Sequence, residues 1–139
     1  MRSFPMKRFG FILMTLLYVA AGVNHFWHPA TYLGIMPPWL PLPELLVIIS
    51  GLAEIVLGLL LLPVRRRAFA AWGIIVLLIA VFPANIQMAI NWHREGHAKE
   101  WIAWARLPLQ AVLIYWAWLY TKAADSRKRF PSQPERKTL

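Results

Sequence analysis

AFAAWGIIVLLIAVFPANIQMAINW, residues 68–92, is a continuous apolar stretch that contains no Asp, Glu, Lys or Arg. A helix needs about 20 mostly apolar residues to cross the hydrocarbon core of a bilayer. A soluble domain would interrupt such a run with polar residues at regular spacing. The stretch therefore predicts a membrane-spanning helix, and the rest of the chain must be read in that setting.

Three further apolar blocks accompany this one, at about residues 9–26, 44–62 and 101–121. The four blocks fill most of a 139-residue chain that is 59% hydrophobic, so no separate soluble domain fits. We predict an all-α integral membrane four-helix bundle over residues 1–122, followed by a basic, disordered cytoplasmic tail over residues 123–139. The first block could also be a cleaved signal peptide, but its apolar run has no polar cleavage region, which favours an uncleaved helix.

Basic residues predict the orientation of these helices. They gather before the first block, between the second and third blocks, and after the fourth, and the net charge is +9. Because positively charged loops remain in the cytoplasm, both termini are expected there, in a multi-pass protein. The same residues would contact anionic lipid headgroups, so binding to nucleic acid is not expected. The absence of cysteine excludes thiol chemistry.

The segment between the first two blocks, residues 28–43, contains five prolines and no charge. Proline lacks a backbone donor, so we expect this segment to be non-helical. It is too apolar to extend into water, and Tyr32 and Trp39 suit the headgroup layer. The segment should therefore fold over the outer mouth of the bundle, as an interfacial anchor or as a lid.

Apart from Glu44 at the edge of the second block, two charged residues lie within the apolar blocks, Glu54 near the middle of the second and Arg106 in the outer third of the fourth. A charge at the centre of a spanning helix costs about 2.5–3.5 kcal/mol on insertion scales. We expect Glu54 and Arg106 to form a pair, which would offset part of this cost. Gly51 and Gly58 share the face of Glu54 at helical spacing, so another helix should approach closely there.

Further polar residues fall in the predicted outer half of the bundle. Arg106 and Gln110 share one helical face. Asn85 and Gln87 follow Pro83 and lie about 160° apart on an ideal helix, so one of them could bind the backbone that the proline opens. The one-sided distribution favours an outward-opening ligand pocket, although a structural network between helices would use the same residues. The predicted ligand-binding residues are Glu54, Arg106, Gln110, His25 and Asn85.

Neither a catalytic group nor a metal site is predicted. His93 and His97 are spaced four residues apart, but they do not form a recognised zinc motif, and we interpret them as solvated. No glycine-rich phosphate loop and no paired carboxylates occur within the apolar blocks. Whether the protein is an enzyme is therefore left open.

Several short motifs together resemble the DoxX-like family of small bacterial membrane proteins. They are AGVNHFWHP, PPWLP, SGLAEIVLGLLLL, VFPANIQMA and ARLPLQ, in that order, between Ala21 and Gln110. The resemblance implies a four-helix protein of the bacterial cytoplasmic (inner) membrane. It also implies a link to quinone-dependent or oxidative-stress chemistry, usually beside a separate redox protein.

Two functions are compatible with these features. In the first, the protein is a quinone- or lipophile-associated redox accessory subunit, and Arg106 and Gln110 donate hydrogen bonds to a quinone oxygen. Glu54 would then balance Arg106, and His25 could carry a proton. In the second, the protein is a non-enzymatic membrane scaffold for a partner, and the polar residues only hold the helices together. No covalently bound cofactor is expected in either case, and a homo-oligomer is compatible with both.

Overall fold

The computed structural model describes residues 4–122, and α-helices are the regular secondary structure of this part of the chain. The helices are α1 (Phe4–Trp27), α2 (Pro29–Gly34), α3 (Pro43–Leu60), α4 (Val64–Arg94) and α5 (Glu100–Trp118). The all-α prediction is confirmed for these residues. The tail predicted over residues 123–139 lies outside them.

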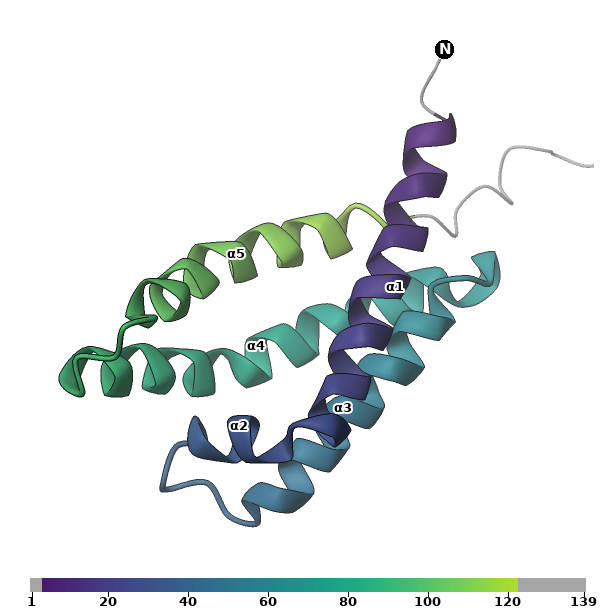
Figure 1. The fold of residues 1–139 in the computed structure, drawn as a ribbon. Coiled ribbons are helices and arrows are strands. Elements are labelled where there is room, and N and C mark those ends of the chain that lie inside the picture. Colours follow the sequence, from purple (N-terminus) through teal and green to yellow (C-terminus); the bar gives the residue numbers. More distant parts are fainter. Residues whose placement is uncertain (1–3, 123–139) are drawn as a thin grey trace, which may run out of the picture.

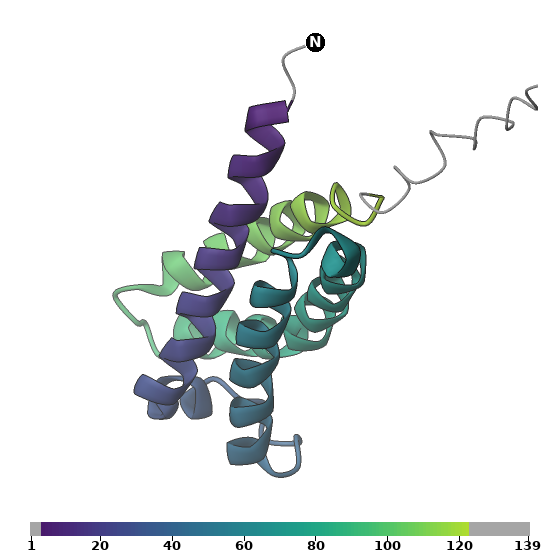
Figure 2. The ribbon, with the colours of Figure 1, turned by 90° about the vertical axis from the view of Figure 1, so that its right-hand side faces the viewer.

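The four long helices form two antiparallel pairs (Figures 1 and 2). Helix α1 packs against α3, and α4 packs against α5, while α3 and α4 join the pairs. The pairs meet near residues 61–63, which link α3 to α4, and they diverge from there (Figure 1). We call this the turn end and the opposite one the α2 end, because α2 lies where the pairs have separated. The predicted bundle is therefore open at one end.

Three of the helices are long and apolar enough to cross a membrane: α1 over Arg8–Trp27, α3 and α4. This supports a membrane protein. Helix α5, which was predicted as a fourth span, is not among them. It is long enough, but Glu100, Arg106, Gln110 and its tryptophans make it less apolar than the others.

The main hydrophobic core lies at the turn end, where all four long helices contribute. Met14, Leu61 and Ile74 are fully buried there, and Ala70, Ala71 and Ala117 let the helices approach closely. A smaller cluster of Met88, Ala89 and Ala103 holds α4 against α5 nearer the α2 end. Apolar packing is therefore strongest at the turn end, which leaves room for a cavity farther out.

Glycines bring α1 and α3 together. A Cβ atom added at Gly22 would lie 2.5 Å from the carbonyl oxygen of Gly51, and one added at Gly51 would lie 2.7 Å from the Cβ of His25. At Gly58, an added Cβ would lie 3.2 Å from the Cβ of Tyr18. The prediction that the glycine face of residues 51–58 receives another helix is confirmed, and that helix is α1.

The segment between α1 and α3 corrects one prediction. Residues 28–43 were expected to be non-helical, but Pro29–Gly34 form the short helix α2. Pro29 stands in its first turn, where the missing backbone donor costs nothing. Pro43 likewise begins α3. Two of the five prolines therefore mark where helices start, and the other three lie in residues 35–42, which connect α2 to α3 without a helix.

Arg67 of α4 connects the α3–α4 link and α1 at the turn end. Its Nε donates to the carbonyl of Leu61 at 2.7 Å, and its Nη2 donates to that of Leu62 at 2.9 Å. Its guanidinium carbon lies 3.6 Å from the centre of the Phe11 ring. Arg67 thus caps the carbonyls of the link that follows α3 while it packs against α1.

Replacing Arg67 with glutamine should destabilise the protein by about 2 kcal/mol, because hydrogen bonds from a charged donor are worth roughly 1.5–3 kcal/mol each. The exposed neighbour Arg66 offers a matched control, since Arg66→Gln removes the same charge without the caps. Thermal unfolding in detergent would measure both variants. Equal melting temperatures for the two would show that the caps contribute nothing.

Candidate functional site

A cavity of about 410 Å³ lies between the two helix pairs. Residues from all five helices line it, and most of them are apolar. All five residues predicted from the sequence as ligand-binding contribute to this one lining: His25, Glu54, Asn85, Arg106 and Gln110. The structure therefore brings together positions that are spread over 86 residues of chain in four different helices.

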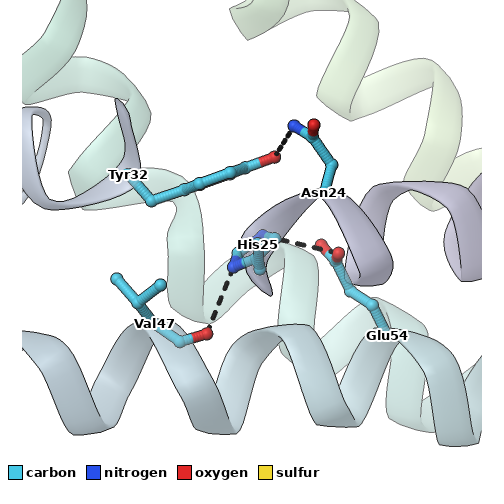
Figure 3. A network of polar contacts seen from close by, with 5 residues as sticks. All are labelled: Asn24, His25, Tyr32, Val47 and Glu54. Carbon is cyan, nitrogen blue, oxygen red and sulfur yellow. Dashed lines mark hydrogen bonds and ion pairs between the residues drawn. The ribbon is translucent and has the colours of Figure 1, made fainter. Parts of the chain in front are cut away.

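The wall formed by α1 and α3 carries a histidine–carboxylate pair (Figure 3). Nε2 of His25 lies 3.5 Å from Oε2 of Glu54. Nδ1 of His25 lies 3.2 Å from the carbonyl oxygen of Val47, one helical turn before Gly51. Because Gly51 has no side chain, the His25 ring can lie directly against α3.

The predicted pairing of Glu54 with Arg106 is wrong. Within residues 4–122 the structure has no ion pair between them, and Glu54 is paired with His25 instead. Arg106 projects from α5 on the other side of the cavity, which it also lines. The physical reason is the pairing of helices: α3 packs against α1, so the nearest polar side chain to Glu54 comes from α1.

Helix α2 covers the histidine. The ring of Tyr32 stacks on the ring of His25, with centroids 3.7 Å apart and planes at 25°. The Tyr32 hydroxyl accepts a hydrogen bond from the amide of Asn24 at 2.8 Å, which holds the ring in place (Figure 3). The Asn24 amide oxygen in turn lies 3.0 Å from Nδ1 of His28. The segment expected to fold over the mouth thus contributes Tyr32 to the cavity wall.

Gln110 joins α5 to α4 on the opposite wall. Its amide nitrogen donates to the carbonyl of Leu78, and its amide oxygen accepts a hydrogen bond of 2.9 Å from Asn85. Pro83 frees the carbonyl of Ile79, four residues before it, and Leu78 is the residue next to Ile79. Gln110 therefore bonds to the helix backbone beside the position that the proline opens, while Asn85 bonds to the Gln110 side chain. Gln87 instead bonds to Asn91 on the same helix at 2.8 Å.

Arg106 is the cationic group of the cavity. The one hydrogen bond that the structure records for it within residues 4–122 runs from Nη1 to Sδ of Met88 at 3.5 Å, and a thioether is a weak acceptor. A guanidinium carries five donors. Arg106 consequently keeps most of its donor capacity.

Two buried polar atoms lack partners on the α1 and α3 wall. They are the hydroxyl of Tyr18, whose residue is only 6% exposed, and Oε2 of Glu54, which makes no hydrogen bond although it lies 3.5 Å from Nε2 of His25. Tyr18 also lines the cavity. Buried polar groups are normally hydrogen-bonded, so each such atom requires an explanation, and an occupant of the cavity would supply one.

Sequence reasoning did not assign Tyr18 or Tyr32 to the site. Tyr18 precedes His25 by seven residues and so shares its helical face, which is a usable signal. Tyr32 gave no such signal, because its position depends on α2. His93 and His97 lie outside the cavity lining, where His93 is 3.2 Å from Oε2 of Glu100 and His97 stacks on Trp92. The part of the chain described here holds no cluster of three metal-ligating side chains.

Comparison with known proteins places the chain in a family. No curated protein and no solved structure matches it. A family model described as a domain of unknown function, DUF8561, matches residues 14–121, which include α2 and every residue of the cavity lining. Because this match covers well over half of the 139 residues, the chain belongs to the DUF8561 family.

Proposed function

We propose that this protein binds a quinone, or a similar lipophile with oxygen acceptors, in the cavity between its helix pairs. It would serve there as an accessory to a redox partner protein, as its resemblance to the DoxX-like family implies. We place it in the bacterial cytoplasmic membrane with four spans and both termini in the cytoplasm.

The path of α5 supports a fourth span. It runs back along α4, and Tyr120 just beyond its end lies edge-on to Phe11 in α1, with ring centroids 6.4 Å apart. Phe11 in turn lies under Arg67 near the start of α4. Helix α5 therefore returns to the level of Phe11 in α1 and of the start of α4. Arg8, Arg65, Arg66 and Lys122 are exposed at that same end, in keeping with a cytoplasmic face.

One observation carries the proposed ligand: polar groups with unused hydrogen-bonding capacity stand on opposing walls of a mostly apolar cavity. Tyr18 and Glu54 are on the wall of α1 and α3, and Arg106 is on the wall of α4 and α5. Apolar residues such as Leu17, Val81 and Leu113 lie around them. A quinone has a flat ring with acceptor oxygens at opposite ends and a membrane-soluble tail, so it matches this distribution. Gln110 uses one of its two N–H donors for the carbonyl of Leu78, so one donor remains for an occupant.

The test is binding of decylubiquinone to the protein in mild detergent, together with mass spectrometry of small molecules that co-purify. Arg106→Leu should weaken decylubiquinone binding by at least about tenfold, because it removes a charge-assisted hydrogen bond worth roughly 1.5–3 kcal/mol. Arg94→Leu makes the same change at an exposed position outside the cavity lining and should bind like the wild type. Unchanged binding by a folded Arg106→Leu protein would refute the assignment.

The second candidate function, a scaffold for a partner protein, has support in the contacts of Gln110. Its bridge to Leu78 and Asn85 is structural, as a scaffold reading expects. Under that reading, only bulk phospholipid would co-purify with wild type and Arg106→Leu alike, and decylubiquinone would bind neither. Crosslinking in native membranes would then identify the partner.

A further inference from the structure

The orientation of His25 determines where its protons are. Nδ1 faces the carbonyl oxygen of Val47 at 3.2 Å. A carbonyl oxygen can only accept a hydrogen bond, so Nδ1 must carry a proton. In a neutral imidazole the other ring nitrogen, Nε2, would then be unprotonated. That nitrogen is the one that faces Glu54.

A neutral His25 beside an ionised Glu54 would therefore place two lone pairs against each other. Nε2 and Oε2 are 3.5 Å apart, and the side chains of His25 and Glu54 are 10% and 15% exposed, so water screens them little. A single proton on either atom removes the repulsion. It gives an ion pair if it resides on Nε2, and a neutral acid beside a neutral imidazole if it resides on Glu54.

We infer that His25 and Glu54 share one proton, and that they use it to donate a hydrogen bond to an oxygen of the molecule held in the cavity. Binding of that molecule is then linked to protonation of the pair. The inference rests on the proposed function for the identity of the occupant, but the shared proton follows from the geometry of His25.

The surroundings direct this proton toward the cavity. Both residues line the cavity, and Oε2 of Glu54 has no hydrogen-bond partner within the described chain. The Tyr32 ring of α2 covers one face of the imidazole. The other titratable groups of the lining are the hydroxyls of Tyr18 and Tyr32 and the guanidinium of Arg106. The one polar side chain that α4 contributes to the lining, Asn85, is uncharged.

The pair also fixes the charge of the site. A pair that holds one proton has no net charge, whichever atom carries it. Arg106 then remains as the uncompensated charge of the lining, which favours an occupant with electron-rich oxygens. When the pair loses its proton, the wall gains a negative charge and loses a donor, and such an occupant should bind less well.

The dependence of decylubiquinone binding on pH tests this inference. Wild-type affinity should fall as pH rises through the range where the pair loses its proton, by at most about tenfold per pH unit for one proton. Glu54→Gln keeps a donor that does not titrate, so its affinity should not change with pH. Glu44→Gln, at an exposed acid at the start of α3, should follow the wild type. If Glu54→Gln does not fold, the double variant His25→Gln, Glu54→Gln replaces it, because neither of its side chains titrates.

The results of this experiment distinguish the shared proton of His25 and Glu54 from the proposed binding of a quinone-like ligand. Wild-type binding that is as insensitive to pH as that of Glu54→Gln overturns the inference and leaves the proposed function intact. No wild-type binding at any pH overturns the proposed function, and spectra of the ligand-free protein then decide the inference. Support would be a doubly protonated His25 by ¹⁵N NMR, or a neutral one protonated on Nδ1 beside a carboxylic-acid infrared band that Glu54→Gln removes. A neutral His25 beside an ionised Glu54 would overturn it.

Discussion

Replacing His25 with leucine is expected to destabilise the protein by about 3 kcal/mol, and replacing Glu54 with leucine as well should recover much of that loss. Removing one partner of a buried ion pair leaves the other without compensation, which typically costs 3–5 kcal/mol. Removing both partners restores an apolar contact between α1 and α3. Because Glu54 can take up a proton when His25 is absent, we expect the lower end of that range.

A double-mutant cycle on unfolding in detergent would measure this coupling, and the same cycle with Arg106 supplies the comparison. The coupling between His25 and Glu54 should exceed that between Arg106 and Glu54, because only the first pair is in contact. A larger coupling energy between Arg106 and Glu54 than between His25 and Glu54 would instead support the pairing predicted from the sequence. Additive effects of His25→Leu and Glu54→Leu would mean that the contact contributes nothing to stability.

Gly22→Leu should have an effect of similar size, about 3 kcal/mol, for a steric reason. A Cβ at this position would lie 2.5 Å from the backbone oxygen of Gly51 and 2.7 Å from a side-chain carbon of Ile55, so α1 would have to move away from α3. Overpacking usually costs 1–3 kcal/mol, and a backbone neighbour cannot rotate out of the way. The gain in helix propensity over glycine, less than about 1 kcal/mol, cannot offset this cost.

Gly34→Leu is the matched control, since a Cβ added at Gly34 meets nothing within 4 Å. Its melting temperature in detergent should stay near that of the wild type while that of Gly22→Leu falls. Because Gly22 lies one turn before His25, Gly22→Leu should also reduce decylubiquinone binding. If the two variants are equally stable, the close approach of α1 and α3 is not required for folding.

Much of the fold could be predicted because hydropathy and charge act locally. The uncharged run at residues 68–92 predicts a helix that the structure contains, and Gly51 and Gly58 indicated where another helix approaches. The cavity-lining positions could be found for a similar reason. A polar side chain in an apolar helix needs polar surroundings, so such side chains can be expected to share one site. The structure places all five in the cavity lining: His25, Glu54, Asn85, Arg106 and Gln110.

The contacts themselves could not be predicted, because sequence indicates the depth of a residue along a helix and not which helix lies beside it. Glu54 was assigned to Arg106 by charge alone, yet α3 packs on α1 and so Glu54 meets His25. The contact of Tyr32 with His25 could not be predicted for another reason. Its stacking on His25 depends on α2, a six-residue helix between prolines with no periodic pattern to indicate it.

The two helix pairs extend far from the turn end, so a small rotation there would produce a large displacement at the cavity. Asn85 lies 18 residues beyond Arg67 along α4, which corresponds to about 27 Å at a rise of 1.5 Å per residue. Each degree by which the α4–α5 pair rotates about residues 61–63 would therefore displace this wall by about 0.5 Å. Small angular changes at this well-packed pivot would thus change the aperture of the chamber.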